Sequence, residues 1–267
     1  MKKLVYLLML FCCSLPVSAN PHIEYKDGVY HITLNDISKT AKRMDFVSVD
    51  ELETNFNIHK AYKSKLTVNT GFFDPNNKKT ISYIESKDEG SENPLFNEAL
   101  ISNPILSKNL GKILNRTEFR VLECEDNSYQ YEITAHNNPV PAGCSILTSA
   151  QGGPELYPNL KLEEEFFIVK DSAGNIIRES CSVLHKTART IFALKGDTVI
   201  ILIFTNKAPI TLLEAQEYLK NLNIDKAMAF DGGSSTSLDY KDEIHVVSTQ
   251  NDGNDTGRKL KSFMIYK

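Results

Sequence analysis

The 267-residue chain lacks most of the patterns from which a cofactor or a partner is commonly inferred. Its cysteines do not have the spacing of a metal site, and its six histidines are scattered without an HExxH or similar cluster. It has no basic stripe, and its formal net charge of −4 argues against nucleic acid as a partner. We therefore predict no metal and no other cofactor.

Repeats and low-complexity linkers are also lacking, but the first 19 residues have the pattern of a secretory signal. Lys2 and Lys3 supply the positive start, residues 4–13 the apolar core, and Val17-Ser-Ala19 a small-residue cleavage site. The apolar core is too short to span a membrane, and no later segment is long enough. We expect cleavage near Ala19–Asn20 to leave residues 20–267 as one exported domain, periplasmic or secreted, without a membrane span.

Only three cysteines remain after that cleavage, which allows at most one internal disulfide and leaves one thiol over. They are Cys124, Cys144 and Cys181. Cys124 and Cys144 flank a predicted hairpin formed by residues 119–124 and 129–135, so we expect these two to be bonded.

The stretch around which the rest is organised is Ala227-Met-Ala-Phe-Asp231-Gly-Gly-Ser-Ser-Thr236. An apolar run, the pattern of a buried strand, leads straight into an acid, two glycines and three hydroxyls. Upstream, residues 197–205 are β-branched and apolar, typical of a strand covered on both faces. Between them, Thr211-Leu-Leu-Glu214 is a capping-box signature, followed by apolar residues at helical spacing.

This order of strand, helix and strand indicates a crossover unit with neighbouring parallel strands. The fold class that we predict is α+β or mixed α/β, with a mixed central sheet that includes this parallel unit near the C-terminus. Asp231 would lie at the carboxyl end of a parallel strand, where open α/β sheets bind their ligands. The alternative is a hairpin turn at Gly232-Gly233, with Asp231 opening it.

Other segments have clear local patterns. Residues 84–93 are interpreted as a solvated loop and Glu163-Glu-Glu165 as a solvated face, and residues 94–114 show an irregular helical pattern. Arg189, at the start of a predicted strand, is either an ordinary edge charge or a planar fork aimed at an anion. Further strands are predicted at 29–34, 46–49, 66–69 and 262–266.

Five ordered motifs resemble those of the phosphodiester glycosidase family, over about residues 60–267. Asn69-Thr-Gly-Phe-Phe resembles the family's Asn-Ala-Gly-Phe-Phe motif, and Gly152-Gly-Pro-Glu-Leu156 resembles its Gly-Pro-x-Leu segment. Arg189-Thr190 resembles the head of its Arg-Thr strand, Asp231-Gly-Gly-Ser-Ser-Thr its Asp-Gly-Gly-Ser-Ser signature, and Gly257-Arg258 its final Gly-Arg. Thr70 in place of alanine and Ile191-Phe-Ala193 in place of Ala-Ile-Gly depart from the pattern.

The resemblance implies an exported hydrolase that removes a sugar from a glycosyl-1-phosphodiester, such as an N-acetylglucosamine-1-phosphodiester, by attack at the anomeric carbon. Phosphate is a good leaving group, so one carboxylate suffices where ordinary glycosidases need two. We assign catalysis to Asp231 and Arg189. Substrate and phosphate binding is assigned to Asn69, Gly71, Gly153, Thr190, Gly232, Gly233, Ser234, Ser235 and Arg258.

Three other functions stay open. A serine hydrolase would use Ser234 or Ser235, although Gly-Gly-Ser-Ser is not the G-x-S-x-G pattern. A non-catalytic envelope protein would bind a glycan or sugar phosphate in the same pocket. A phosphodiesterase, metal-dependent or not, would attack phosphorus instead of carbon.

The signal pattern makes the first testable prediction. Mass spectrometry of the protein purified from its native cell envelope should show a mature N-terminus at Asn20, because the small residues before it fit a signal-peptidase site. Cytosolic protein that retains Met1 would contradict this prediction.

Overall fold

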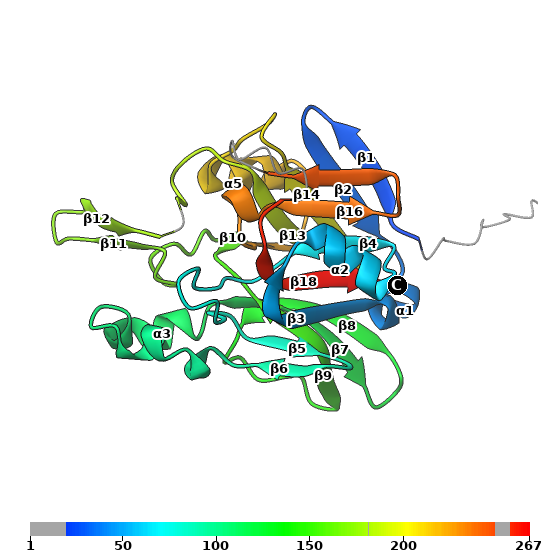
Figure 1. The fold of residues 1–267 in the computed structure, drawn as a ribbon, viewed down its shortest axis with the longest axis horizontal. Helices are drawn as coiled ribbons and strands as arrows, with labels where there is room; N and C mark the ends of the chain where they lie inside the picture. Colours follow the sequence, from blue (N-terminus) through cyan, green and yellow to red (C-terminus); the bar gives the residue numbers. More distant parts are fainter. Residues whose placement is uncertain (1–19, 181, 249–256) are drawn as a thin grey trace, which may run out of the picture.

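A computed structural model describes residues 20–180, 182–248 and 257–267 (Figure 1). The predicted signal at residues 1–19 and the predicted leftover thiol of Cys181 lie outside the described residues. The assignment of residues 20–267 to one domain stays a prediction.

Three antiparallel sheets and one small hairpin contain the described strands. The six-stranded sheet has the order β1 (His22–Lys26), β2 (Val29–Leu34), β14 (Thr198–Phe204), β13 (Arg189–Lys195), β15 (Lys226–Ala229), β10 (Glu155–Tyr157). The second, here the β4 sheet, has the order β17 (Ile244–Val247), β16 (Ser237–Tyr240), β4 (Leu66–Asn69), β18 (Leu260–Tyr266), β3 (Met44–Glu53). The third, the β7 sheet, has the order β6 (Gly90–Glu92), β5 (Ile84–Ser86), β9 (Cys144–Gln151), β7 (Thr117–Cys124), β8 (Tyr129–Ala135). The hairpin pairs β11 (Ile168–Lys170) with β12 (Ile176–Glu179).

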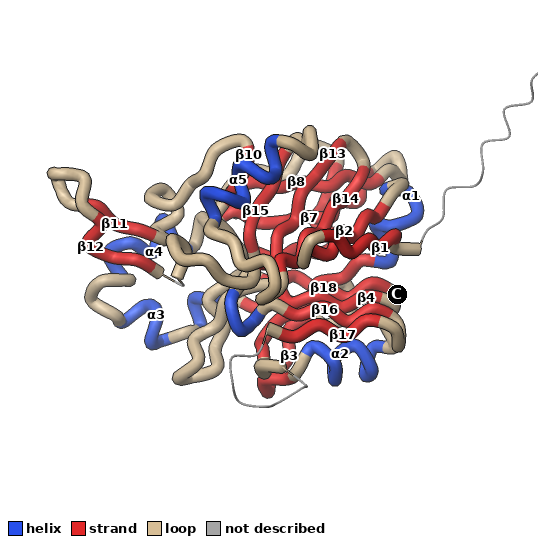
Figure 2. Tube along the Cα trace, turned by 90° about the horizontal axis from the view of Figure 1, so that it is seen from above, coloured by secondary structure: helices blue, strands red, loops and turns tan. Residues whose placement is uncertain are grey.

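The helices are short and lie between and outside the sheets (Figure 2). Their bounds are α1 (Ile37–Thr40), α2 (Asn55–Tyr62), α3 (Glu98–Ser102), α4 (Leu110–Ile113) and α5 (Leu212–Lys220). Four single 3₁₀ turns are η1 (Ala41–Arg43), η2 (Pro94–Phe96), η3 (Ser107–Asn109) and η4 (Gly233–Ser235). The predicted capping box is confirmed, because the Thr211 side chain accepts from the Glu214 N–H while the Glu214 side chain accepts from the Thr211 N–H.

The predicted fold class, α+β or mixed α/β with a mixed central sheet that includes a parallel unit, is wrong. β14, α5 and β15 do follow one another, but β13 lies between the two strands and pairs antiparallel with each of them. Ala193, for example, lies opposite both Ile200 of β14 and Ala227 of β15. All strand pairings among the described residues are antiparallel. The sequence pattern of β14, α5 and β15 does not reveal that the preceding strand, β13, lies between β14 and β15 in the sheet. The inference of neighbouring parallel strands failed for this reason.

One apolar core joins the three sheets. Its centre holds Phe46 of β3, Phe119 of β7, Phe192 of β13 and Phe230 after β15, with neighbouring ring centroids 4.9–6.4 Å apart. The opposite face of the six-stranded sheet packs against α5, so β14 is covered on both faces as predicted. Phe230 directly precedes Asp231, and its edge-to-face contact with Phe192 fixes the end of β15.

The local features of the chain agree with the sequence-based expectations in part. The Cys124–Cys144 disulfide is confirmed and joins β7 to β9, and the hairpin of β7 and β8 is present as predicted. Residues 84–93 form the small hairpin of β5 and β6 instead of a loop. Glu163 and Glu164 are exposed, but Glu165 is buried, so the prediction of a solvated face is wrong for this residue. Its carboxylate accepts hydrogen bonds from the Thr117 hydroxyl and from the Glu155 N–H.

Candidate active site

A cavity of about 470 Å³ lies where the ends of the sheets meet the short helices and the β11–β12 hairpin. Its lining combines the turn after β15, the segment before β18 and the aromatic pair after β4 with residues of two further segments. These segments surround α3 and α4 and the β11–β12 hairpin. The lining residues are Phe72, Phe73, Pro75, Ile81, Leu100, Leu106, Ile113, Arg116, Arg178, Ser180, Ser182, Thr187, Asp231, Gly232, Gly233, Ser234 and Arg258. Of the predicted site residues, five line this cavity: Asp231, Gly232, Gly233, Ser234 and Arg258.

Asp231 lies in the segment that connects β15 of the six-stranded sheet with β16 of the β4 sheet. Its N–H donates to the Thr70 carbonyl (3.0 Å), and the N–H of Phe230 before it donates to the Thr190 carbonyl (2.9 Å). The first bond reaches the end of β4 and the second reaches β13, so both sheets fix this point of the backbone. Asp231 is consequently held at the seam between the two sheets.

The carboxyl group of Asp231 has an unusual pKa. Burial raises the pKa to about 6, against the hydrogen bond from Ser235 and the charge of Arg258, which lower it. The Gly232 N–H and the charge of Arg189 also favour the ionised form. A carboxyl group with this pKa changes its charge close to neutral pH, which suits a group that exchanges protons or attacks as an anion.

Gly232 and Gly233 allow the backbone conformation of the turn after Asp231. Gly233 has a φ of +61°, which favours glycine, and its N–H donates to the Ala188 carbonyl (2.8 Å). A Cβ on Gly232 would lie 3.0 Å from that same carbonyl oxygen. The N–H groups of these two predicted phosphate-binding glycines therefore donate to the Asp231 carboxylate and to the Ala188 carbonyl in this structure.

Arg258 is linked to Asp231 through a serine. Its Nη1 donates to the hydroxyls of Ser235 (3.1 Å) and Ser234 (3.3 Å), and its guanidinium lies 5.1 Å from the centre of the Phe73 ring. Ser235 is fully buried and hydrogen-bonds the Asp231 carboxylate. This chain of contacts places a fixed cation beside the carboxylate at the cavity wall.

Arg189 lies behind the cavity wall, and it is only 4% exposed. Its Nη2 donates to the carbonyls of Ser182 (2.9 Å) and His185 (2.7 Å), and its Nε donates to the Ile210 carbonyl (3.2 Å). The guanidinium therefore ties the loop before β13 to the start of that strand. Its charge still acts on Asp231.

Four other predicted residues also lie behind the wall: Asn69, Gly71, Gly153 and Thr190. The Asn69 side chain donates to the Asp231 carbonyl (2.6 Å) and accepts from the Thr190 hydroxyl (2.7 Å). Gly153 has a φ of +97°, and a Cβ there would lie 2.2 Å from Glu165 Oε2. Asn69, Thr190 and Gly153 thus support the backbone around Asp231, whereas a Cβ on Gly71 would lie 2.8 Å from the Ser82 Cβ.

Two arginines of the cavity were missed by the sequence reasoning. Arg178, on β12, donates through Nη1 to the Phe166 carbonyl (2.9 Å) and lies 4.2 Å from the centre of that ring. Arg116, just before β7, donates through Nε to the Glu165 carbonyl (3.0 Å) and lies 4.0 Å from the centre of the Phe167 ring. Neither belongs to a recognised motif, so only the fold brings them to Asp231.

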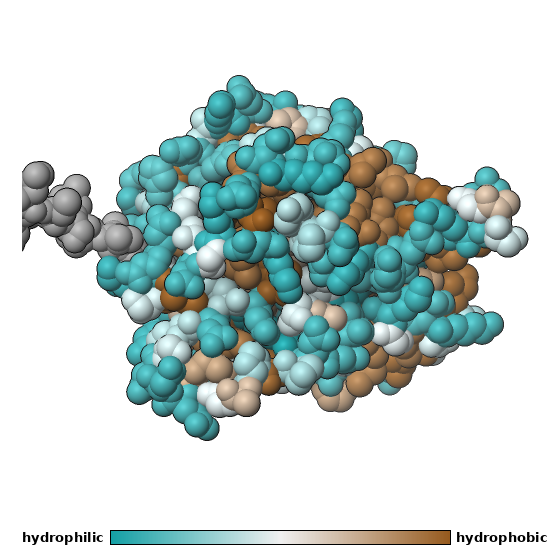
Figure 3. Space-filling model, turned by 180° about the vertical axis from the view of Figure 1, so that it is seen from behind, coloured by the Kyte–Doolittle hydropathy of each residue, from teal (hydrophilic) through white to brown (hydrophobic). Residues whose placement is uncertain are grey.

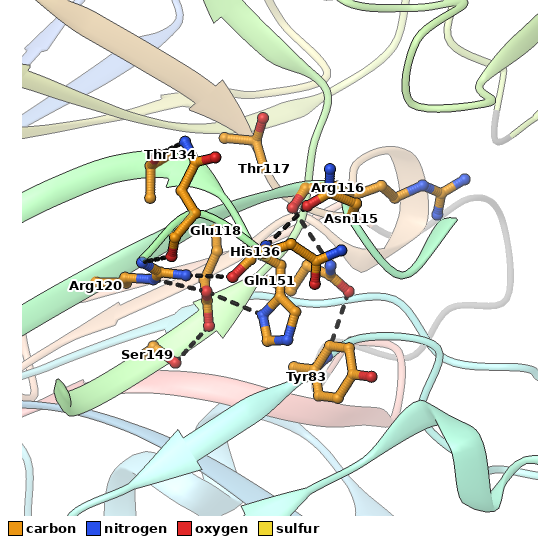
Figure 4. Close-up of polar contacts among 12 residues, drawn as sticks. Tyr83, Asn115, Arg116, Thr117, Glu118, Arg120, Thr134, His136, Ser149 and Gln151 are labelled. Atoms are coloured by element: carbon orange, nitrogen blue, oxygen red, sulfur yellow. Dashed lines mark hydrogen bonds and ion pairs between the residues drawn. The ribbon is translucent and has the colours of Figure 1, made fainter. Parts of the chain in front are cut away.

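A buried polar network holds the strand from which Arg116 extends (Figure 4). Glu118 accepts from Ser149 (2.6 Å), Arg120 (2.9 Å) and His136 (3.1 Å). Burial alone would raise the pKa of Glu118, but these hydrogen bonds and charges hold it below its ordinary value. The Arg116 carbonyl accepts from the His136 N–H (3.2 Å), while its guanidinium points away from the network.

The part of the chain that the structure describes contains no group of three His, Cys, Asp or Glu residues able to hold a metal ion. Within the same described residues, no helix is long and apolar enough to cross a membrane.

Comparison with known proteins agrees with the motifs. A model of the phosphodiester glycosidase family matches residues 62–266. The fold is similar to that of the zebrafish N-acetylglucosamine-1-phosphodiester alpha-N-acetylglucosaminidase catalytic domain auto-inhibited by its pro-peptide, with a TM-score of 0.65 and 12% identity over 95% of this chain and 84% of that chain. A hypothetical protein from Synechocystis has a TM-score of 0.54 and 13% identity over 92% of this chain and 61% of its own. A search of curated proteins finds no match.

The raised pKa of Asp231 predicts a pH-dependent loss of stability. Because the folded-state pKa is about 6 and the ordinary value is 3.8, its contribution is fully present below pH 3.8 and is lost as pH rises through 6. Asp231→Asn removes this titration, so the melting temperature of the variant relative to wild type should increase from pH 4 to pH 7.5. Asp50→Asn, at an exposed position, controls for loss of a surface charge. An equal difference at both pH values would contradict the prediction.

Proposed function

The chain belongs to the phosphodiester glycosidase family and is a glycosidase, and from its site we propose that it hydrolyses glycosyl-1-phosphodiesters at the anomeric carbon. The observation that carries this proposal is the composition of the cavity. Among the described residues that line it, Asp231 is the one carboxylate, and it is accompanied by Arg116, Arg178 and Arg258. One carboxylate and several arginines match a substrate with an anionic leaving group.

The leaving group explains why a second carboxylate is not needed. Ordinary glycosidases use one carboxylic acid to protonate a departing alkoxide and a second carboxylate as nucleophile or base. A departing phosphate monoester is stable as an anion and needs no strong acid. The cavity accordingly supplies cations where an ordinary glycosidase supplies its acid.

Asp231 acts in this proposal as nucleophile or as base. As base it takes a proton from water, whose oxygen then bonds to the anomeric carbon while the bond from that carbon to the phosphate oxygen breaks. As nucleophile it bonds to the carbon itself, and water later releases the sugar. Either role requires the ionised carboxylate, which the Ser235 hydrogen bond and the Arg258 charge favour.

The three arginines act on the phosphate. One negative charge is added to the phosphate as the carbon–oxygen bond breaks, so fixed cations bind the transition state more tightly than the substrate. The guanidiniums of Arg116, Arg178 and Arg258 are each held by a carbonyl or hydroxyl and an aromatic ring. Because they are fixed beforehand, little reorganisation accompanies the reaction. Ser234 adds a hydroxyl donor at the same wall.

The remaining predicted residues have positioning roles in this proposal. Asn69, Thr190, Gly71 and Gly153 hold the backbone that carries Asp231, and Ser235 connects Asp231 with Arg258. Arg189 contributes charge and orders the loop before β13. We further propose an N-acetylglucosamine-1-phosphodiester-like substrate, after the sugar that the zebrafish relative's name gives, and a periplasmic or secreted location.

The proposal predicts which bond breaks and what Asp231 does. Hydrolysis in oxygen-labelled water should place the label on the sugar, and Asp231→Asn should slow turnover at least ~100-fold, the scale of one positioned acid–base group. The wild-type rate should fall as pH drops through about 6, because Asp231 is then protonated. Mass spectrometry of the products and the pH profile of kcat measure these results.

The outcomes separate the open functions. Label in the phosphate would mean attack at phosphorus, and an activity that rises below pH 6 would make Asp231 an acid. Tight binding without product would leave a glycan-binding protein. Loss of activity to a serine-reactive phosphonate, with Asp231→Asn retaining turnover, would favour the serine hydrolase.

The arginine contacts predict two different phenotypes. Arg258→Lys keeps the charge but loses the planar fork at the cavity wall, so kcat/KM should fall at least ~10-fold with little change in melting temperature. Arg189→Lys should instead lower the melting temperature, because its bonds to Ser182, His185 and Ile210 cannot all be made by one ammonium group. Steady-state kinetics and thermal unfolding measure both. If Arg189→Lys is as stable as wild type and raises KM, Arg189 binds the phosphate itself.

A further inference from the structure

Exposed large apolar side chains are concentrated on two segments of the molecule. Ten such residues occur in the described chain, and seven of them lie within residues 95–105 or 176–184. They are Leu95, Phe96, Ile101, Ile105, Ile176, Ile177 and Leu184, with exposed fractions from 37% to 78%. The segments around α3 and the β11–β12 hairpin project from the same end of the molecule (Figures 1 and 2). Hydrophobic surface gathers at that end (Figure 3).

This apolar surface continues into the cavity. Leu100 and Leu106 line the cavity, while their neighbours Ile101 and Ile105 are exposed, at 37% and 61%. Leu100 and Ile113 belong to a small core with Phe166, against which Val169 of β11 packs, so the two projecting segments meet at its base. The cavity therefore has an apolar wall that leads outward to exposed apolar side chains.

Other lining residues of the cavity are polar or charged. Asp231, Ser234 and Arg258 come from the ends of the sheets, Arg116 precedes β7, and Arg178 lies on β12 next to Ile177. The cavity thus combines anion-binding groups with apolar side chains. A ligand that matches both has an anionic head and an apolar tail.

We propose that the group esterified to the phosphate of the substrate is an apolar chain, of alkyl or isoprenoid type, which lies along residues 95–106 and the tip of the β11–β12 hairpin. The proposal rests on the glycosyl phosphodiester activity proposed above. A cavity of about 470 Å³ is within the range of ligand sites and has room for the sugar phosphate, from which the chain extends over the mouth. Exposed apolar patches of this kind mark binding sites in soluble proteins.

A second sugar, bound along residues 95–106 in place of the apolar chain, would need polar side chains around it. Sugar hydroxyls require donors and acceptors, whereas the side chains of Phe96, Ile101 and Ile105 offer none. Burial of each CH₂ of an alkyl chain against such side chains is favourable by the hydrophobic effect. The mouth of the cavity therefore favours an apolar chain over a second sugar.

The test uses N-acetylglucosamine-1-phosphate esterified with methyl, butyl or octyl alcohol, assayed below the micellar concentration of the octyl ester. We expect kcat/KM to rise at least ~10-fold from methyl to octyl, chiefly through KM. Ile105→Ser should reduce the octyl-to-methyl ratio of kcat/KM toward one. Leu213→Ser, on α5 outside the two segments and also 61% exposed, is the matched control and should leave the ratio unchanged.

Each outcome bears on one of the two proposals. Equal kcat/KM for methyl and octyl esters would overturn the apolar chain while leaving the glycosidase activity intact. A chain preference that arises only above the micellar concentration would also overturn it, since the patch would then recognise a lipid surface. If no ester is hydrolysed, the proposed activity fails. The apolar site is then tested by calorimetry, which compares the binding affinity of octyl methyl phosphate with that of dimethyl phosphate. Tighter octyl binding that Ile105→Ser removes would support the apolar site, and equal binding would overturn it.

Discussion

The side-chain amide of Asn69 is the contact on which the arrangement of the site depends. Its nitrogen donates to the Asp231 carbonyl, and its oxygen accepts from the Thr190 hydroxyl and the Ser237 N–H. These partners lie at the end of β15, on β13 and on β16, so one buried side chain of β4 connects the six-stranded sheet with the β4 sheet. A buried amide without its partners costs about 1–3 kcal/mol. The network therefore favours a single alignment of the sheets, and with it a single position of Asp231.

Electrostatics at this seam combine two opposing effects. Burial works against the ionised Asp231, while Ser235, Arg258 and the Gly232 N–H favour it, and the result is a pKa of about 6. Much of the donor capacity of the nearby arginines is directed at main-chain carbonyls, as Arg116 to Glu165, Arg178 to Phe166 and Arg189 to Ser182 show. Such bonds fix the direction of a guanidinium group. The cavity therefore holds arginine side chains at fixed positions next to one titratable carboxylate.

The sequence predicted the local features of this site better than its assembly. Asp231 after an apolar strand, the capping box at Thr211 and the Cys124–Cys144 pair are confirmed because each depends on neighbouring residues or on a short hairpin. β13 lies between β14 and β15, and several strands of similar apolar character compete for such a place in the sheet. The hydrophobic periodicity of the sequence does not tell which strand takes it. Arg116 and Arg178 were missed for a related reason, since they reach the cavity from the β7 sheet and the β11–β12 hairpin. Asn69 and Arg189 were identified, but a motif does not tell whether a side chain contacts a ligand or the backbone behind it.

The place of β18 in the β4 sheet has a consequence for biosynthesis. β18 is the most C-terminal of the described strands, yet it lies inside the sheet and pairs with both β4 and β3, which are near the other end of the sequence. While the chain is being made, Val68 and Asn69 have no partner on that side until Met264 and Phe263 have emerged. Pairing across so long a stretch of sequence is slow to form. The seam that holds Asp231 is thus completed only after β18 has been synthesised, so shorter nascent chains lack it, and their open strand edges are where a chaperone would act.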